Sequence, residues 1–375
     1  MKTTIANRYA LSVAAAGALF AGCGNSQLPT GISGPTSQAP AAKSASFVYL
    51  AQCCRQLFSN YGNITLYDLE LAGVARTITK GVSNPSFITV DRAGRVYMIS
   101  YDYRGGVTEY DAGSERPSRR IKLTDASTAA TDGSDNLYAA VCPLCYEYQS
   151  GKGSIDVYTA GTTTLVRTIN EGIVAPAALA FDTDGNLYVL NRNGSKTAVN
   201  VYAPGSSKPH RKLPQGLTDP FAIALDPSNN LFVMRNGYSS PASVVEYKAG
   251  SNEILRTITR GISSPQAMTF DSSGTLYVSN TPYPSQGWVS VYAPGASTPS
   301  YRITSGMHDP QLLAIDGKGN LYVGNDYYAV ALDRPDTSSS DSGSVCVYPP
   351  KGKRPLRCLQ NEPYSYPYSL AVKPH

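Results

Sequence analysis

The amino-acid sequence predicts an all-β fold, a seven-bladed β-propeller over residues 44–375, and three observations carry this prediction. The 375 residues include 33 Gly, 26 Pro and 27 Tyr, a composition typical of short strands joined by many turns. A repeat with a period in the forties runs along the chain, and four-stranded propeller blades have this length. The strands that the repeat defines are incomplete at the two chain ends, in a way that lets the ends complete one another.

The N-terminal residues 1–22 have the layout of a signal peptide. Two basic residues precede an apolar run over residues 10–21 that is too short to span a membrane as a helix. The stretch LFAGC at 19–23 resembles the lipobox of bacterial lipoproteins, although Phe20 stands where Leu is usual. The resemblance implies that Cys23 is lipidated and begins the mature chain. The alternative is an ordinary secretory signal with an incidental cysteine.

Residues 23–43 are interpreted as the lipid anchor and a flexible linker, because they are rich in Pro, Gly, Ser and Ala without an apolar period. This anchor predicts a location in the cell envelope, attached to the membrane. Gly24 in place of Asp points to the outer membrane of a Gram-negative cell, on its periplasmic side or at the cell surface. Without the signal, 30 basic residues stand against 27 acidic ones, a net charge of +3 that is too mild and dispersed for nucleic-acid binding.

The repeat is clearest in four segments. They read IDVYTAGTTTLVRTINEGIVAPAALAFDTDGNLYVLN (155–191), VNVYAPGSSKPHRKLPQGLTDPFAIALDPSNNLFVMR (199–235), VVEYKAGSNEILRTITRGISSPQAMTFDSSGTLYVSN (244–280) and VSVYAPGASTPSYRITSGMHDPQLLAIDGKGNLYVGN (289–325). Weaker copies start at Ile64 and Val107. A recurring Tyr falls at positions 67, 110, 158, 202, 247, 292 and 348, with spacings of 43, 48, 44, 45, 45 and 56 residues.

Each unit divides into four strands. The pattern LAxD is the first, and the following DxxGN is a tight turn in which Asp bonds back to the backbone and Gly takes a positive φ. NLYVxN is the second strand, VxVYxxG the third and xRTI the fourth. Several of these runs alternate apolar and other residues, as expected of strands packed between two neighbouring sheets.

The chain ends predict how the ring closes. First strands end near Asp91, Asp132, Asp182, Asp226, Asp271, Asp316 and Val372. The last of them, YPYSLAVKPH, has no second strand after it, whereas SASFVYLAQ at 44–52 is a second strand with no first strand before it. We therefore expect residues 44–52 to pair with residues 367–372 in one blade, which gives seven blades.

The pattern P-x-x-LAFD-x-x-GNLYV-x-N…V-x-VY resembles NHL-repeat and related lactonase-like propellers and covers essentially all of residues 44–375. The resemblance implies the fold, but this fold serves binding, scaffolding and catalysis alike. Gluconolactonase-like members hold a divalent metal with Glu, Asn and Asp ligands at the channel mouth, and streptogramin-lyase-like members use His and Glu. The segments entering the first strands here contain no Glu, and His210, His308 and His375 are far apart in the repeat. We therefore expect no catalytic residues, no metal and no cofactor, and an enzyme is the alternative.

Two recurring polar features have a metal-binding and a structural interpretation. Asn191, Asn280 and Asn325 end second strands, and Arg235 takes the same place in another blade. These amides could ligate a metal, but because they follow the repeat we favour a role in satisfying backbone groups between blades. DTDGN at 182–186 resembles the start of a calcium loop, yet no bidentate Glu follows, so we interpret it as a structural turn.

Tyrosine-rich loops between second and third strands carry the binding hypothesis. We expect these loops to share one face with the connections into the first strands, and an aromatic rim suits a peptide, glycan or polyphenol. The candidate ligand-binding residues are Tyr61, Tyr101, Tyr103, Tyr146, Tyr148, Tyr238, Tyr283, Tyr327 and Tyr328. The predicted function is a monomeric binding or interaction module for an unidentified protein, peptide or glycan. The alternatives are a metal-dependent lactonase or hydrolase and a structural envelope scaffold.

Six further cysteines are expected to form disulfides, since export favours them. Cys346 and Cys358 fall on neighbouring third and fourth strands of the last blade and are predicted to bond across them. For the others, local pairing is favoured, Cys142 with Cys145 and Cys53 with Cys54, all four lying just past second strands. Cross-linking over the second blade, a zinc site and a thiol-redox centre are the alternatives.

Overall fold

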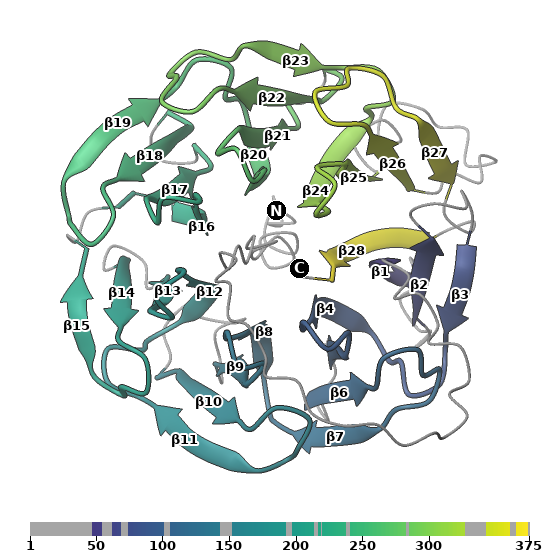
Figure 1. The fold of residues 1–375 in the computed structure, drawn as a ribbon, viewed down its shortest axis with the longest axis vertical. Helices are drawn as coiled ribbons and strands as arrows, with labels where there is room; N and C mark the ends of the chain where they lie inside the picture. The colour runs from purple at the N-terminus through teal and green to yellow at the C-terminus, as the bar shows by residue number, and fades with distance from the viewer. Residues whose placement is uncertain are drawn as a thin grey trace, which may run out of the picture.

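The computed structural model describes residues 47–54, 62–68, 74–100, 106–142, 152–192, 197–213, 217–218, 220–237, 241–282, 285–326, 343–360 and 365–373. Within these ranges every regular element is a strand, and no helix of sufficient length and apolarity to cross a membrane occurs there. The strands form seven four-stranded sheets arranged radially around a common axis (Figure 1). The predicted seven-bladed β-propeller is therefore confirmed.

We label the sheets as blades A to G in chain order. Blade A contains β28 (Ser365–Val372), β1 (Phe47–Cys54), β2 (Gly62–Asp68) and β3 (Val74–Ile78). Blade B contains β4 (Pro85–Val90), β5 (Val96–Ser100), β6 (Gly106–Tyr110) and β7 (Arg119–Lys122). Blade C contains β8 (Ala126–Thr131), β9 (Leu137–Val141), β10 (Ser154–Tyr158) and β11 (Leu165–Ile169).

The remaining blades follow the same plan, each from an inner first strand to an outer fourth strand. Blade D contains β12 (Pro176–Phe181), β13 (Leu187–Asn191), β14 (Ala198–Tyr202) and β15 (Pro209–Lys212), and blade E contains β16 (Pro220–Leu225), β17 (Leu231–Arg235), β18 (Ser243–Tyr247) and β19 (Ile254–Ile258). Blade F contains β20 (Pro265–Phe270), β21 (Leu276–Asn280), β22 (Trp288–Tyr292) and β23 (Tyr301–Ile303), and blade G contains β24 (Asp309–Ile315), β25 (Leu321–Asp326), β26 (Ser344–Tyr348) and β27 (Arg357–Gln360).

The chain ends close the ring in blade A, as predicted. Strand β28 pairs antiparallel with β1 from Val48↔Val372 to Cys54↔Ser365. One detail of the prediction is wrong, because Cys53 and Cys54 are the last residues of β1 rather than the start of a loop. Cys53 is the backbone partner of Gly62 on one side and Tyr366 on the other, so pairing on both sides extends the strand.

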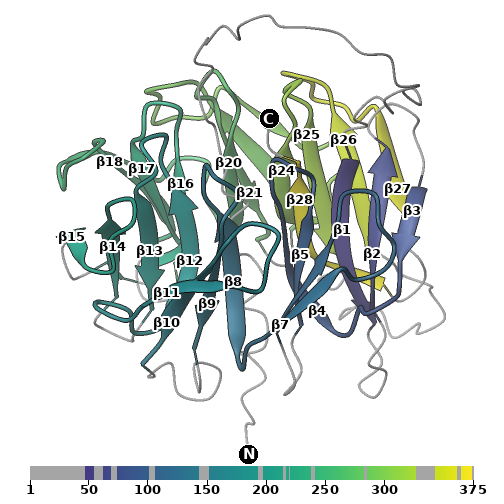
Figure 2. The same cartoon turned by 60° about the horizontal axis from the view of Figure 1, so that its bottom comes forward.

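The hydrophobic core lies between adjacent blades, and side-chain alternation explains how one strand serves two interfaces. In β13, Tyr188 and Leu190 pack with residues of blade E, whereas Leu187 and Val189 pack with residues of blade C. Six clusters of buried residues together cover all seven blade interfaces. Burying a Val or Leu side chain stabilises a fold by about 1.5–3 kcal/mol, so these clusters hold the blades side by side (Figure 2).

The DxxGN segments are structural turns, as predicted. In blade D the Asp182 carboxylate accepts hydrogen bonds from the backbone N–H groups of Asp184 (3.0 Å) and Asn186 (2.8 Å). Gly185 has a φ of 81°, which favours glycine. The Asp182 carboxylate is thus engaged by its own turn and by the Tyr188 side chain, which fits a structural turn rather than a calcium loop.

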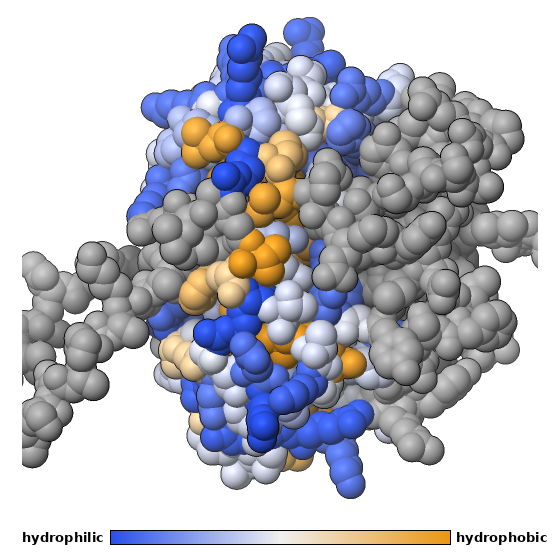
Figure 3. Space-filling model, turned by 90° about the vertical axis from the view of Figure 1, so that its right-hand side faces the viewer, coloured by the Kyte–Doolittle hydropathy of each residue, from blue (hydrophilic) through white to orange (hydrophobic). Residues whose placement is uncertain are grey.

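The outer rim of the ring is formed by the edges of the fourth strands. Exposed apolar side chains occur at or near these edges, namely Val74, Leu165, Val166, Ile254, Leu255 and Leu356. Figure 3 shows the side of the ring that carries β27 and β3, where a narrow band of apolar atoms runs between hydrophilic ones. The apolar positions are thus interrupted by charged and polar side chains, which protects open sheet edges from pairing with other chains.

Candidate functional site

One face of the ring brings together the starts of the first strands and the ends of the second strands, and we call it the entry face. The contact is made by backbone hydrogen bonds. Arg192 N–H after β13 donates to Ala175 C=O before β12 (2.8 Å), and Thr281 N–H after β21 donates to Ser264 C=O before β20 (3.1 Å). The prediction that second-strand ends and first-strand entries share a face is therefore confirmed.

Every first strand carries a β-bulge at its entry-face end. In β12, for example, Pro176 pairs with Asn191 and Ala178 with Leu190, which leaves Ala177 unpaired. The residues in this position are Ser86, Ser127, Ala177, Phe221, Gln266, Gln311 and Tyr368. Bulges re-aim side chains and are frequent beside functional sites. These seven residues form what we call the bulge ring, on the strands nearest the axis.

The bulge ring differs in chemistry from blade to blade, although the strands around it repeat. Six of its seven members follow a Pro, yet they comprise small, hydroxyl, amide and aromatic side chains. Ser127 and Phe221 are buried, and the other five are half-buried. A variable side chain on an otherwise repeated scaffold is the arrangement expected of a recognition surface.

Blades F and G contribute a polar network to the entry face. The Gln266 side-chain amide donates to the Thr281 hydroxyl (2.9 Å) and to Ser264 C=O (3.3 Å). The Asp309 carboxyl is in turn hydrogen-bonded to the side chains of Thr281 and Gln311. This network crosses the boundary between the two blades and links two members of the bulge ring.

Asp309 is the most unusual ionisable group of this network. It is only 7% exposed, and its cross-strand partner is Asp326 at the end of β25. Burial, and after it the negative charge of Asp326, raise its pKa to about 7 against the opposing effect of the Gln311 and Thr281 hydrogen bonds. A carboxyl group that titrates near neutral pH at a shared face is a candidate functional group.

Asp309 is not among the residues predicted from the sequence, because the metal site of the resembling family implies Glu in the first-strand entry segments and these segments contain none. Asp precedes Pro in DPQLL, and Asp326 directly follows the repeated Asn325 at the end of the second strand. Asp309 and Asp326 both lie at the entry-face end of blade G, because β24 begins where β25 ends. The signal available in the sequence was therefore the coincidence of two acidic residues at these two repeat positions.

Blades D and E present different chemistry on the same face. The Arg192 guanidinium lies 5.9 Å from the centre of the Phe221 ring, a cation–π contact. In blade E, Arg235 at the end of β17 donates through Nε to Thr218 C=O (3.0 Å). The entry face is therefore polarised, with cationic and aromatic groups in blades D and E and carboxyl and amide groups in blades F and G.

The repeated amides at the second-strand ends hold the connections between blades, as favoured from the sequence. The side-chain oxygens accept backbone N–H groups, Asn191 from Val174 (3.0 Å), Asn280 from Ser263 (2.8 Å) and Asn325 from His308 (3.2 Å). These oxygens already have a backbone donor, which leaves them poorly suited to ligate a metal.

The residues present do not fit the metal site that the lactonase-like resemblance implies. The entry segments lack Glu, the repeated Asn side chains are engaged with the backbone, and the carboxyl pair of blade G contributes two ligands. Within the described ranges no group of three or more His, Cys, Asp or Glu residues could hold a metal ion. We therefore derive no chemistry through a bound metal.

Several predicted site residues lie outside the described residues. They are Cys23 with the whole of residues 1–43, Cys145, and the nine candidate tyrosines Tyr61, Tyr101, Tyr103, Tyr146, Tyr148, Tyr238, Tyr283, Tyr327 and Tyr328. The tyrosine rim remains a prediction. The bulge ring, which the sequence analysis did not identify, is the part of the entry face that the structure describes.

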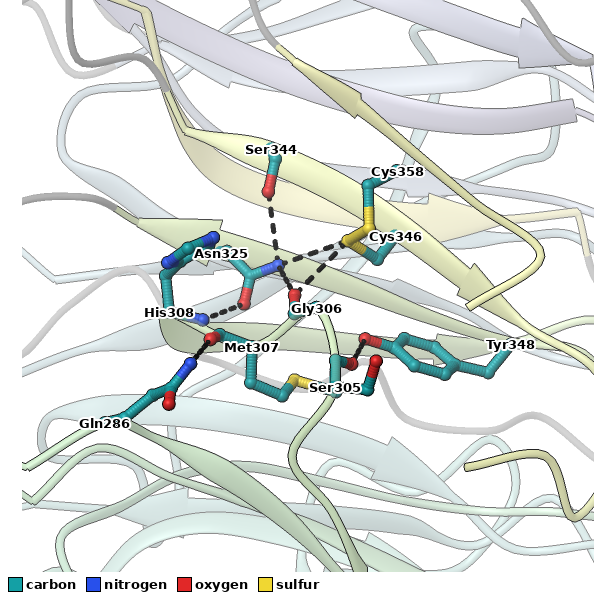
Figure 4. Close-up of a disulfide and its surroundings, with 10 residues drawn as sticks. All are labelled: Gln286, Ser305, Gly306, Met307, His308, Asn325, Ser344, Cys346, Tyr348 and Cys358. Carbon is teal, nitrogen blue, oxygen red and sulfur yellow. Dashed lines mark hydrogen bonds between the residues drawn. A yellow bond between two sulfur atoms is a disulfide. The ribbon is translucent and has the colours of Figure 1, made fainter. Parts of the chain in front are cut away.

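The predicted Cys346–Cys358 disulfide is confirmed (Figure 4). The two residues are cross-strand partners in β26 and β27, with a Cα–Cα distance of 4.0 Å. Cys142 directly follows β9, as expected, and is also disulfide-bonded. The side chains of Cys53, Cys54 and Cys145 lie outside the described set, so the pairing among these four cysteines remains a prediction.

Comparison with known proteins places the fold but not the activity. No protein-family model matches the chain, and no curated protein matches it in sequence. Among solved structures, hydrazine synthase of Kuenenia stuttgartiensis is similar, with a TM-score of 0.54 and 17% identity over 70% of this chain and 76% of that one. At this identity the likeness concerns the fold alone. The chain is thus a seven-bladed β-propeller with a chemically polarised entry face.

Proposed function

We propose that this protein is a lipid-anchored, extracytoplasmic binding module of the NHL-like type that recognises its ligand on the entry face. The observation that carries the proposal is the bulge ring. Seven equivalent positions, redirected by seven bulges, hold side chains of different chemistry on a scaffold that is otherwise repeated. We expect the predicted tyrosine-rich loops to extend this surface.

The chemistry of the entry face indicates the class of ligand. The Asp309 carboxyl and the Gln266 and Gln311 amides offer hydrogen-bond acceptors and donors. Arg192, whose guanidinium lies over the buried Phe221 ring, offers a cation. A peptide or glycan with hydroxyl or amide groups along its length would meet complementary partners in both sectors.

Two features support an extracytoplasmic location. The signal-like residues 1–22 end in a lipobox-like stretch at Cys23, and residues 23–43 have the composition of a tether. The Cys346–Cys358 disulfide is of the kind that persists in oxidising compartments. Each acyl chain on Cys23 would contribute about 0.8 kcal/mol per buried CH₂ to membrane attachment.

The binding proposal is tested by probing the mature chain against peptide and glycan arrays, and then measuring affinity for the retained probe. We expect Arg192→Ala and Gln311→Ala to weaken binding at least about fivefold, since one anchor contact is worth more than about 1 kcal/mol. Lys248→Ala, in an exposed ion pair with Glu253 away from this face, is the matched control. Unchanged affinity in both entry-face variants would refute the assignment of the site.

A second candidate function is metal-independent hydrolysis, favoured by one observation. The Asp309 carboxyl has a pKa of about 7, within the range of a general base working near neutral pH. A panel of lactone and ester substrates distinguishes this function from binding. Turnover that is lost in Asp309→Asn while the variant still binds the probe would favour the enzyme. An absence of turnover in the wild type leaves the binding module.

A further inference from the structure

The segment from Ser305 to His308 connects blade F to blade G and delivers Asp309 to the entry face, and we call it the F–G connector. Side chains bond three carbonyl groups and one N–H group of this segment (Figure 4). The bonds run from Tyr348 Oη to Ser305 C=O (2.7 Å), from Asn325 Nδ2 to Gly306 C=O (3.2 Å), from Gln286 Nε2 to Met307 C=O (2.5 Å), and from His308 N–H to Asn325 Oδ1 (3.2 Å).

Other blades hold the corresponding Gly carbonyl with a further side chain, two residues before the repeated Tyr of the third strand. In blade D, Asn200 Nδ2 donates to Gly172 C=O (2.6 Å). In blade F, Ser290 Oγ donates to Gly261 C=O (2.7 Å). We call this position the staple, because it fastens the connection from the preceding blade to the third strand.

In blade G the staple position is Cys346. Its Sγ lies 3.4 Å from Gly306 C=O, in the same relation as the oxygen of Ser290 to its own glycine. Cys346 is also bonded to Cys358 of β27. The packing around Gly306 is close, since a Cβ there would stand 2.9 Å from Tyr348 Oη and 3.2 Å from Cys358 Sγ. Cys346 Sγ therefore contacts the F–G connector and is covalently bonded to the outermost strand of blade G.

The two oxidation states of Cys346 differ in whether Sγ can donate a hydrogen bond. In the disulfide Sγ carries no hydrogen, so it cannot donate to Gly306, and Asn325 supplies the hydrogen bond to that carbonyl. In the thiol form the S–H group is a weak donor at a suitable distance from the carbonyl oxygen. Oxidation thus exchanges a hydrogen bond to the F–G connector for a covalent bond to β27.

We propose that Cys346 is a redox-dependent staple, which fastens β27 when oxidised and the F–G connector when reduced. Both states are compatible with the fold, because the reduced state reproduces the arrangement that Ser290 has in blade F. Reduction releases the outermost strand of blade G while the connector that carries Asp309 stays in place. The device thus confines the structural effect of reduction to the rim of the ring.

The chemical step is reduction by a dithiol. Cys358 is only partly buried on the edge strand, whereas Cys346 is 1% exposed, so the thiolate of the reductant attacks Cys358 Sγ. The Sγ–Sγ bond breaks, Cys346 leaves as a thiolate and takes up a proton, and a mixed disulfide forms on Cys358. The second thiol of the reductant resolves this bond, which yields two protein thiols and one oxidised dithiol for a transfer of two electrons.

The test compares Cys346→Ser, Cys346→Ala, Cys358→Ser and Cys358→Ala with the wild type in excess dithiothreitol. If Cys346 acts as a staple in the reduced state, Cys346→Ser unfolds at a higher temperature than Cys346→Ala, because the hydroxyl can donate to Gly306. The two Cys358 variants should match the reduced wild type. If Cys346 merely fills space, the order of Ser and Ala reverses, because a buried hydroxyl without a partner destabilises.

Hydrogen exchange gives a readout that does not depend on global unfolding. When the wild type is reduced, the backbone amides of β27 should lose their protection from hydrogen exchange, whereas those of the F–G connector should keep it. In reduced Cys346→Ala the connector should lose protection as well. Equal exchange of the connector in reduced wild type and reduced Cys346→Ala would overturn the proposal, as would loss of connector protection on reduction of the wild type.

Discussion

Asp309 and Asp326 are cross-strand partners at the entry-face end of blade G, so two carboxyl groups meet where β24 begins and β25 ends. The first is buried, and hydrogen bonds from Thr281 and Gln311 only partly offset the effect of that burial. Like charges in such positions resist simultaneous ionisation. The pair therefore makes the stability of this propeller depend on pH near neutrality.

The sign of this dependence follows from the raised pKa of Asp309. The ordinary pKa of an aspartate is 3.8, and that of Asp309 is about 7 in the folded protein, so the folded state binds the proton more tightly than the unfolded state. The stabilising contribution is complete below about pH 4 and is lost as the pH rises to about 7. We expect the contribution of this pair to the melting temperature of the protein to fall across that interval and to level off above it.

Asp309→Asn removes the titrating group and keeps the shape of the side chain. This variant should melt at a higher temperature than the wild type at pH 8, and the difference should shrink towards pH 5. Asp326→Asn should change the profile in the same sense, because it removes the like charge. Melting curves from pH 4 to pH 9 test this, and a variant less stable than the wild type at pH 8 would be evidence against the pair.

A second prediction concerns the turn residue Asn229 of blade E, which has a φ of 63° where blades B, D, F and G have Gly. Its side chain accepts from Thr183 N–H (3.0 Å) and donates to the Thr183 hydroxyl (2.7 Å) in blade D. Asn229→Gly keeps the backbone conformation but loses both bonds, and should cost about 1–2 kcal/mol of unfolding free energy in urea. Gly274→Asn, at the same turn position in blade F, is the matched control and should cost less than about 1 kcal/mol.

Blade E offers two ion pairs of opposite exposure, which gives a third prediction. Glu246 is 6% exposed and lies 2.5 Å from Arg256 Nε, whereas the Lys248–Glu253 pair (3.3 Å) is exposed on both sides. Glu246→Ala leaves a largely buried guanidinium without its carboxylate and should cost about 3 kcal/mol. Glu253→Ala should cost less than about 1 kcal/mol, because solvent screens the exposed pair. Similar losses for both variants in chemical denaturation would contradict this reasoning.

A fourth prediction concerns membrane attachment through Cys23. In a bacterial host the full chain should incorporate labelled fatty acid and partition into the detergent phase of a Triton X-114 separation. Cys23→Ser should do neither, since the acylated thiol is missing. Cys346→Ser, which keeps Cys23, is the control and should still be labelled. Fatty-acid labelling that survives Cys23→Ser would place the modification elsewhere.

The repeat in the sequence determined the fold, because one blade is a local unit that its own residues specify. The alternation in NLYVLN, the Asp and Gly of each turn and the complementary strands at the two chain ends were sufficient to predict seven blades and their closure. The Cys346–Cys358 bond was predictable for the same reason, since register within a blade follows from a short turn. Residues close in sequence make the contacts within blades B to G, and only the closure in blade A pairs residues from the two chain ends.

The entry face was decided by the tertiary structure. The bulge that each first strand carries gives equivalent positions to Ser86, Gln266 and Phe221. Such a one-residue shift in register is not visible in the sequence pattern. Asp309 meets Asp326 through strand pairing within blade G, and it meets Thr281 because blades F and G pack against one another. Its raised pKa results mainly from the burial that this assembly produces. Local sequence thus specified each blade, whereas the chemistry shared between blades arose from burial and proximity that exist only in the closed ring.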